Sequence, residues 1–283
     1  MEIVRTIADL RSHIASWRST GARVGLVPTM GALHDGHLAL VKAARAECER
    51  VVATIFVNPK QFAPNEDLDA YPRREEADLA MLRSAGIALV FMPGTAEMYP
   101  PGFATRVRVA GLTDCLCGAH RPGHFDGVST VVTKLLIQSL PDVAYFGEKD
   151  YQQLVVVRRL ARDLDISVRI AGVPTVRDTD GLALSSRNAY LSPEERRVAP
   201  ALARVLQRMA AALVVQSAAV ANEIARGIAD LESAGFAVEY LEIRDADTLA
   251  PVTETITGPA RVFAAAHLGR TRLIDNLPIV PAA

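Results

Sequence analysis

Apolar runs and helical periodicity alternate along the first half of the chain. Four runs, at residues 24–27, 51–57, 87–91 and 143–146, are almost wholly hydrophobic, as is typical of parallel strands that are buried on both faces. The segments between them place apolar residues every three or four positions, which predicts helices with one buried face. Strands and helices that alternate with short links indicate an α/β protein with a Rossmann-like, doubly wound parallel sheet.

Capping residues and helix breakers set the expected bounds of these elements. Thr6 can cap the first helix, and Gly86 suits the end of a later one. The expected helices cover residues 7–17, 38–48, 73–84, 128–136 and 150–163, and two further short strands are expected at 168–170 and 173–176.

The composition changes after Asn188. Ser192, Pro193 and Glu195 form a capping box with a proline in the first turn, which predicts the start of a long helix that runs to about residue 213. A second helix is expected over 218–233. Two strand-like runs, 237–243 and 261–266, complete this part of the chain.

This change in pattern predicts two domains, with a boundary near residues 176–188. Residues 1–176 are expected to form the Rossmann-like domain that holds the ligands. Residues 177–283 are expected to form a smaller α+β domain that closes over the first as a lid.

Composition narrows the class of protein. The 283 residues are 50% hydrophobic and 22% charged, as in ordinary globular proteins. A net charge of −1 argues against nucleic-acid binding, which normally needs a basic excess. No apolar run approaches the roughly 20 residues of a membrane span, the first residues do not form a signal peptide, and three cysteines make no disulfide framework. We therefore expect a soluble cytoplasmic protein.

The turn after the first buried run carries the first candidate chemistry. Gly31 and Gly36 allow a ligand to approach the backbone closely. Unpaired N–H groups at the start of the following helix would attract an anion, helped by the helix dipole. His34 and His37 lie three apart, so both imidazoles face nearly the same way and can donate to phosphate charge. A nucleotide site is the preferred hypothesis, with a surface histidine pair or half of a zinc site as alternatives.

Two further segments favour a polyphosphate ligand. Lys149 stands between a strand and a helix N-terminus, where its charge opposes the dipole unless a phosphate lies between them. Ser185, Ser186 and Arg187 place two hydroxyls and a guanidinium in a link after a turn, and such groups suit a leaving phosphate. A surface lysine and a polar linker are the alternative interpretations.

Other polar residues are less decisive. Gln61 and Gln153 could orient a carboxylate without neutralising it, because a primary amide carries no charge. Cys115, Cys117, His120 and His124 lie close together in the sequence. Their spacing is not that of the usual zinc arms, and the nearby glycines and proline indicate a loop.

Five segments together resemble the pantoate–β-alanine ligase family. They are residues 28–37, 55–62, 121–128, 145–150 and 180–188, and they occur in the family's order. The His-x-x-His motif alone is shared by a nucleotidylyltransferase superfamily, but the full set is specific to these ligases. Asp178 stands where the family pattern has glutamate, and Tyr151 where phenylalanine is common.

The resemblance implies a reaction and its partners. Pantoate and β-alanine would be condensed to pantothenate with ATP, through a pantoyl adenylate, with release of AMP and pyrophosphate. Mg²⁺ is expected with the triphosphate. Its protein ligands stay unassigned, with Asp78 as one candidate. The resemblance also implies a homodimer.

The resemblance also assigns roles to residues of this chain. His37 would donate a proton, His34 would support the phosphates, and Lys149 and Arg187 complete the catalytic set. Gln61 would contact pantoate and β-alanine, and Gln153 pantoate. The ATP-binding residues would be Met30, Gly31, Ala32, Leu33, His34, Asp35, Gly36, His37, Gly147, Glu148, Lys149, Asp150, Val176, Leu184, Ser185, Ser186 and Arg187.

Two other functions stay open from the sequence. A nucleotidyltransferase would leave the nucleotide on its product, whereas a ligase releases free AMP. A non-catalytic nucleotide- or zinc-binding module would release no pyrophosphate.

Overall fold

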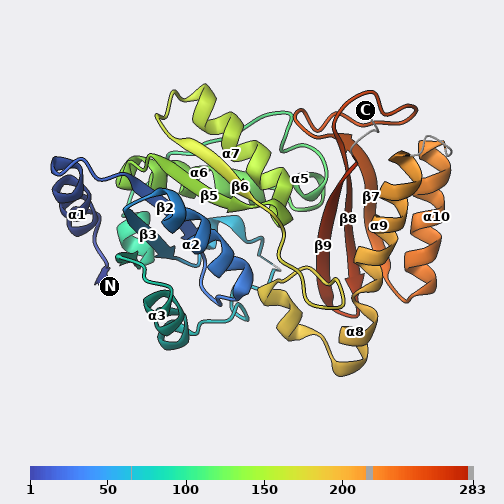
Figure 1. The fold of residues 1–283 in the computed structure, drawn as a ribbon, viewed down its shortest axis with the longest axis horizontal. Helices are drawn as coiled ribbons and strands as arrows, with labels where there is room; N and C mark the ends of the chain where they lie inside the picture. Colours follow the sequence, from blue (N-terminus) through green and yellow to red (C-terminus); the bar gives the residue numbers. More distant parts are fainter. Residues whose placement is uncertain (65, 215–218, 280–283) are drawn as a thin grey trace. The chain divides into compact units, whose positions relative to one another are not determined.

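The chain divides into two compact units in the computed structural model, which describes residues 1–64, 66–214 and 219–279 (Figure 1). The first unit comprises Met1–Glu148 and Gln153–Pro174. The second comprises Lys149–Gln152 and Thr175–Ala283. The backbone therefore enters the second unit for four residues before returning to the first.

The first unit is built on a six-stranded sheet in the order β1-β4-β3-β2-β5-β6, with every neighbouring pair parallel. Its strands are β1 (Glu2–Val4), β2 (Val24–Thr29), β3 (Arg50–Ile55), β4 (Leu89–Phe91), β5 (Val143–Gly147) and β6 (Arg169–Val173). The central strands are buried because helices cover both faces, which is what their apolar sequences require. The predicted α/β class with a doubly wound parallel sheet is confirmed.

Helices cover this sheet in two layers. The helices of this part of the chain are α1 (Ile7–Ser19), α2 (Asp35–Glu47), α3 (Glu75–Ser84), α4 (Thr95–Met98), α5 (Cys117–His120), α6 (His124–Ser139) and α7 (Tyr151–Asp163), with 3₁₀ turns η1 (Pro59–Gln61) and η2 (Glu148–Asp150). Side chains of α2 and α3 pack on one face. The right-handed crossovers of a parallel sheet place α1, α6 and α7 on the other face, where Leu154 of α7 lies against Gly172.

Strand order creates a switch point beside β2. The chain proceeds from β2 to β3 and β4 on one side, whereas β5 and β6 lie on the other. In open α/β sheets, ligands bind at the carboxyl ends of the strands at such a point.

Most predicted elements of the first unit are confirmed, but the short helices α4 and α5 were not predicted, and two strands differ. Two strands were expected at 168–170 and 173–176, but one continuous strand, β6, runs from Arg169 to Val173. The short edge strand β1 was not predicted, because three residues give too little pattern to recognise.

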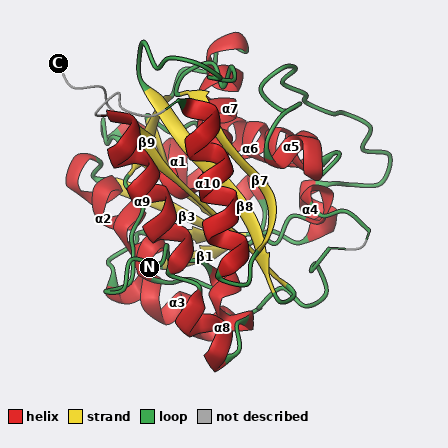
Figure 2. Ribbon diagram, turned by 90° about the vertical axis from the view of Figure 1, so that its right-hand side faces the viewer, coloured by secondary structure: helices red, strands yellow, loops and turns green. Residues whose placement is uncertain are grey.

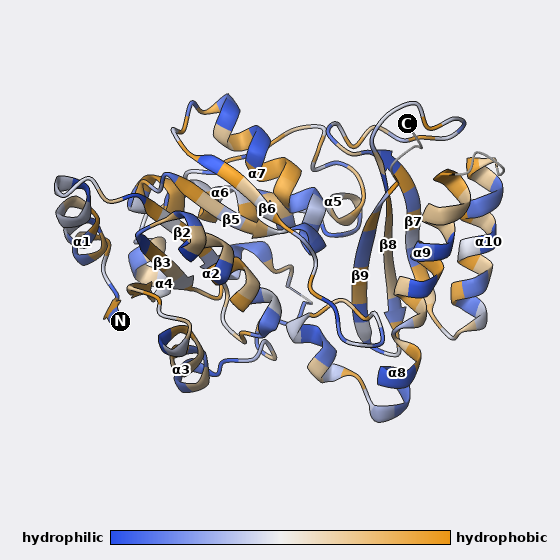
Figure 3. Cartoon of the chain, viewed as in Figure 1, coloured by the Kyte–Doolittle hydropathy of each residue, from blue (hydrophilic) through white to orange (hydrophobic). Residues whose placement is uncertain are grey.

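The second unit contains a three-stranded antiparallel sheet in the order β7-β8-β9. Its elements are η3 (Ser186–Tyr190), α8 (Pro193–Val198), α9 (Ala201–Val214), α10 (Val220–Ser233), β7 (Ala237–Asp245), β8 (Ala260–Leu268) and β9 (Thr271–Ile279). Figure 2 shows α9 and α10 lying over one face of these strands. Both helices alternate hydrophobic and polar residues (Figure 3), as expected of helices with one buried face.

The predicted long helix of the second unit is wrong in one respect. The capping box at its start is present, with Ser192 and Glu195 bonded to each other's backbone N–H groups. The helix is interrupted after Val198, because Pro200 has no N–H to continue the ladder and its ring excludes the carbonyl of Arg196. The start expected for the next helix, residue 218, lies outside the described residues, and α10 begins at Val220. Strand β9 was not predicted.

No described helix combines the length and apolar character needed to cross a membrane.

Candidate active site

Three of the predicted segments follow neighbouring strands of the first unit. Residues 30–37 follow β2, Gln61 ends the 3₁₀ turn after β3, and Gly147 closes β5. Strand β2 pairs with both β3 and β5 in parallel. These segments therefore share the carboxyl edge of the sheet, at its switch point.

The two histidines cap helix α2 reciprocally. Nδ1 of His34 accepts from the N–H of Gly36 at 3.1 Å, and Nδ1 of His37 accepts from the N–H of His34 at 3.3 Å. The ring centroids lie 4.2 Å apart. Because both Nδ1 atoms accept, each neutral ring carries its proton on Nε2. Both imidazoles are thus arranged as Nε2–H donors.

A buried carboxylate holds the loop that precedes these histidines. Asp78, only 2% exposed in the first turn of α3, accepts from the N–H of Ala32 at 2.9 Å and of Leu33 at 2.8 Å. Gly31 and Ala32 both have positive φ, at +81° and +51°. Moreover, a Cβ on Gly31 would lie 2.9 Å from Oδ2 of Asp78. Only glycine fits here without displacing the carboxylate.

These contacts correct the reason given for anion binding at this turn. The sequence predicted unpaired N–H groups there. In the structure, Thr29 Oγ1 accepts from Gly31, Asp78 from Ala32 and Leu33, and the imidazoles from His34 and Gly36. Side chains therefore already accept from the N–H groups of residues 31–34 and 36, whereas these contacts do not cover the N–H of Asp35 at the start of α2. The Nε2–H groups of the two imidazoles are further donors suited to a phosphate.

The amide of Gln61 is oriented by two neighbours. Its Oε1 accepts from Nδ2 of Asn58 at 3.0 Å, and its Nε2 lies 3.1 Å from Sδ of Met30. Asn58 is 1% exposed and accepts from the hydroxyl of Tyr99 at 2.7 Å. Burial raises the pKa of Tyr99, which keeps its hydroxyl protonated as a donor. Met30 and Gln61, predicted to contact different substrates, are therefore brought together.

Helix α6 approaches this turn through a glycine. A Cβ on Gly127 would lie 2.2 Å from the carbonyl oxygen of Lys60 and 2.6 Å from Cα of Gln61. The carbonyl of Gly127 also accepts from Asn58 Nδ2 at 3.2 Å. Residue 127 must therefore be glycine for Gln61 to occupy its place.

His124 supports the backbone of Gln61. Its Nδ1 lies 2.8 Å from the carbonyl oxygen of Gln61, and its Nε2 lies 3.1 Å from Nη1 of Arg121. The carbonyl requires a donor and the guanidinium an acceptor, so the ring has its proton on Nδ1. Both nitrogens are in use, which argues against the zinc alternative for His124.

Arg121 is itself paired with Glu66. Two hydrogen bonds, of 2.8 and 2.5 Å, join the guanidinium and the carboxylate. Burial acts to raise the pKa of Glu66, but the hydrogen bonds and charge of Arg121 outweigh it and hold that pKa below its usual value. Glu66 thus stays charged and fixes Arg121 against His124.

Gln153, the other residue of the first unit that was predicted to contact pantoate, is partly buried in the first turn of α7.

In the second unit, Lys149 lies in η2 with its side chain 18% exposed. Its Nζ is 3.9 Å from a carboxylate oxygen of Asp150. Its main-chain carbonyl accepts from Nδ2 of Asn276 at 2.9 Å.

The serine–arginine segment follows a small hairpin in the same unit. Arg177 and Ala183 form a β-bridge, and the N–H of Leu184 donates to the carbonyl of Val176 at 3.0 Å. Two of the predicted ATP-binding residues, Val176 and Leu184, therefore meet directly. Ser185 then caps η3 by accepting from the N–H of Arg187 at 3.3 Å.

Several residues that shape the site were missed from the sequence. Tyr99, Asp275 and Asn276 bind partners at least 41 positions away in the chain, so the local pattern gave no reason to select them. Asn58 lies inside the motif segment 55–62, but its bond to Gln61 was not foreseen. The one available signal was a polar pair, Asp275-Asn276, next to an apolar run.

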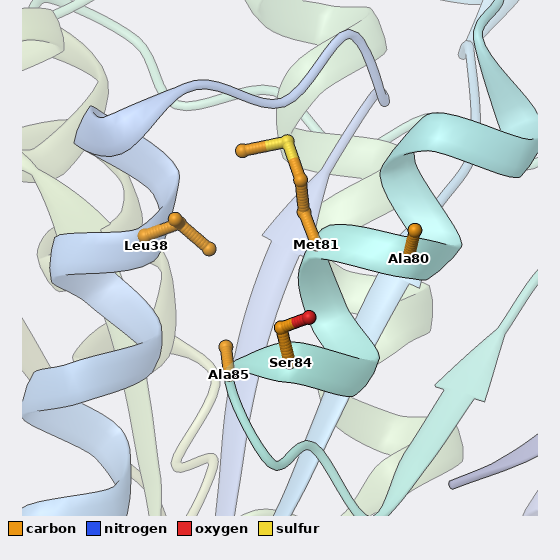
Figure 4. A pocket seen from close by; sticks show the side chains of 5 residues that line it. All are labelled: Leu38, Ala80, Met81, Ser84 and Ala85. Carbon is orange, nitrogen blue, oxygen red and sulfur yellow. The ribbon is translucent and has the colours of Figure 1, made fainter.

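An apolar pocket of about 420 Å³ lies elsewhere in the first unit. Figure 4 shows Leu38 on α2 opposite side chains at the end of α3. Its lining is Leu38, Ala80, Met81, Ser84 and Ala85. These groups do not suit a charged nucleotide.

Within residues 1–64, 66–214 and 219–279, no group of three or more histidines, cysteines, aspartates or glutamates is arranged to hold a metal ion.

Comparison with known proteins agrees with the resemblance. The family model described as Pantoate-beta-alanine ligase matches residues 2–278. A pantothenate synthetase of Rhizorhabdus wittichii is 59% identical, with all of both chains covered. The crystal structure of pantothenate synthetase from Thermus thermophilus has a TM-score of 0.93 and 52% identity, covering 99% of this chain and 100% of that one.

A third relative was solved with ligands. The pantoate-beta-alanine ligase of Francisella tularensis, complexed with beta-gamma ATP and beta-alanine, has a TM-score of 0.83 and 34% identity. The match covers 98% of this chain and 97% of that one. By the family model and by relatives that match over the full length, the chain belongs to the pantoate–β-alanine ligase family.

Proposed function

We propose that this chain condenses pantoate with β-alanine to form pantothenate, using ATP and releasing AMP and pyrophosphate. The observation that carries the proposal is the shared carboxyl edge of β3, β2 and β5, which presents the motif residues of the matching family. Residues 30–37, Gln61 and Gly147 lie there together. This edge is where parallel sheets bind their ligands.

The first step in this proposal forms a pantoyl adenylate. A carboxylate oxygen of pantoate attacks the α-phosphorus of ATP, the bond to the bridging oxygen breaks, and pyrophosphate leaves. The amides of Gln61 and Gln153 orient the pantoate without neutralising its carboxylate, so the nucleophile keeps its charge. Asn58 supports this role because it fixes the direction in which the Gln61 amide points.

Charge on the nucleotide is offset by four side chains in the proposal. The Nε2–H groups of His34 and His37 donate to phosphate oxygens, and His37 supplies a proton to the developing charge. Lys149 and Arg187 stabilise the departing pyrophosphate, since fixed cations act most strongly where charge grows during the reaction. The other ATP-binding residues are those of residues 30–37, Gly147–Asp150, Val176 and residues 184–186.

The second step transfers the acyl group. The amine of β-alanine attacks the acyl carbon, loses a proton, and displaces AMP as the C–O bond breaks. Gln61 is proposed to contact β-alanine as well as pantoate, which places the amine beside the reactive carbonyl.

Magnesium is part of the proposal as a partner of the triphosphate. Mg²⁺ binds through phosphate oxygens, water and one or two carboxylates. Asp78 does not fit that role well, because both of its oxygens accept backbone N–H groups. We therefore assign Asp78 to the loop and derive no step through the metal. A homodimer and a cytoplasmic location are proposed from the family resemblance alone.

A substrate-omission assay tests the function. Purified protein receives ATP, Mg²⁺, pantoate and β-alanine, with each component left out in turn, and AMP, pyrophosphate and pantothenate are measured. We expect free AMP in step with pantothenate only in the complete mixture, and pyrophosphate exchange that needs pantoate but not β-alanine. AMP retained on the product would identify a nucleotidyltransferase, and no pyrophosphate release would leave a binding module.

A further inference from the structure

Strand β9 carries two adjacent buried polar residues in the second unit. Asp275 and Asn276 are 3% and 2% exposed. Buried polar groups are costly unless their hydrogen bonds are made. What these two side chains bind therefore indicates why they are there.

Asn276 holds the main chain at Lys149. Its Nδ2 donates to the carbonyl of Lys149 at 2.9 Å, and its Oδ1 accepts from Nε of Arg261 at 2.8 Å. The guanidinium of Arg261 in turn stacks 3.9 Å from the ring centre of Tyr151. The segment that carries Lys149 is thus fixed to the antiparallel sheet at two neighbouring points.

Asp275 holds the hairpin that leads to Arg187. Its two oxygens accept from Nη1 and Nη2 of Arg177 at 2.7 and 2.8 Å. Arg177 Nη1 also donates to the carbonyl of Gly181, in the hairpin turn, at 3.1 Å. The bidentate pair fixes the guanidinium in direction as well as position.

One dipeptide therefore serves both segments. Successive residues of a strand point to opposite faces, so Asp275 and Asn276 reach different partners. The N–H of Asn276 also donates to Oδ1 of Asp275 at 2.8 Å, which links the two braces. An amide suits the Lys149 side because it adds no charge that could neutralise the ammonium.

We propose that Asp275 and Asn276 are positioning residues that fix Lys149 and the Ser185–Arg187 segment relative to each other for the adenylation step. This inference rests on the proposed function, in which Lys149 and Arg187 act on the leaving pyrophosphate. Catalysis of this kind depends on donors that are already in place, and small displacements reduce it strongly.

The main test is Asn276→Asp. The substitution keeps the acceptor for Arg261 and the shape of the side chain, but removes the donor to the Lys149 carbonyl. We expect pantoate-dependent pyrophosphate exchange to fall about 10- to 100-fold. Aminolysis of supplied pantoyl adenylate by β-alanine should stay close to wild type, because no pyrophosphate leaves in that step.

Two further variants provide a second test and a control. Asp275→Asn breaks the bidentate pair and should also slow exchange more than aminolysis. Glu239→Gln is the control, because it weakens the Arg272–Glu239 pair on the same sheet, whose side chains are 18% and 19% exposed. It should leave both steps unchanged.

The outcomes separate the inference from the function. Equal loss of both steps in Asn276→Asp, in parallel with a lowered unfolding temperature, means a merely structural role and overturns the inference. Unchanged exchange in that variant overturns it too. If wild-type protein fails to release AMP in the omission assay, the proposed function itself fails.

Discussion

The two units hold their candidate phosphate-binding residues in different ways. In the first, the loop before α2 is held by its own histidines and by Asp78, which comes from the following crossover helix. In the second, Lys149 is held by Asn276, 127 positions later, and Arg177 by Asp275, 98 positions later. The histidine contacts join residues two or three positions apart and are visible in the local sequence, whereas these contacts of Asp78, Asp275 and Asn276 join residues at least 45 positions apart and are not.

The largest effect is expected from the second unit. Lys149→Ala removes a cation that the proposal places on the leaving pyrophosphate, so adenylation should slow about 10²- to 10³-fold with the fold intact. Single-turnover measurement of adenylate formation checks this. A wild-type rate in the variant would remove the lysine from the mechanism.

In the first unit, Asp78 supports the loop before α2 by accepting from the N–H groups of Ala32 and Leu33. Asp78→Asn leaves one acceptor oxygen for two N–H groups, so Ala32 or Leu33 loses its bond. We expect unfolding to become easier by about 1–3 kcal/mol, and adenylation to slow by about 10- to 100-fold. Urea denaturation and exchange kinetics measure the two effects. Stability loss with unchanged kinetics would show that the loop geometry does not matter for catalysis.

Gly127→Ala tests the close approach of α6 to Gln61. The new methyl group would overlap the carbonyl of Lys60, so either α6 or η1 must move. Overpacking of this kind costs about 1–3 kcal/mol, and the KM values for pantoate and β-alanine should rise more than that for ATP. Gly94→Ala is a suitable control, since a Cβ there meets nothing within 4 Å. Equal changes in all three KM values would argue against a specific effect on Gln61.

The smallest effect is expected from Glu66. Its folded-state pKa lies below the ordinary 4.5, so its pair with Arg121 stabilises the fold above that value. This stability is lost as the pH falls through the folded-state pKa. Glu66→Gln removes the charge but keeps one acceptor oxygen for Arg121, so it should cost about 1 kcal/mol near neutral pH, with a difference from wild type that shrinks in acid. A difference that grows on acidification would contradict the assignment.

Features that depend on residues close together in the chain were predicted better than features that depend on remote contacts. The strands, most helices and the turn bearing His34 and His37 were predictable, because each depends on residues close together in the chain. The reason given for anion binding at that turn was wrong for residues 31–34 and 36, since the sequence could not show that side chains already accept from their N–H groups. Pro200 could have predicted the interruption between α8 and α9, but the helical periodicity on both sides of it favoured one continuous helix.

The support of the candidate site was less predictable. Tyr99 and the Asp275-Asn276 pair bind partners that are at least 41 positions away in the chain, which neither periodicity nor a local motif encodes. Whether the proposed ATP-binding residues act on one nucleotide stays a prediction for the kinetic experiments.

The short excursion of the backbone at Lys149–Gln152 limits how this enzyme can be divided. Because the chain changes unit after Glu148, after Gln152 and after Pro174, no single cut yields two complete modules. A fragment ending at Pro174 would retain Lys149 but lack the β9 amide that braces it. A truncation, domain exchange or circular permutation should therefore keep Lys149 and strand β9 in the same polypeptide.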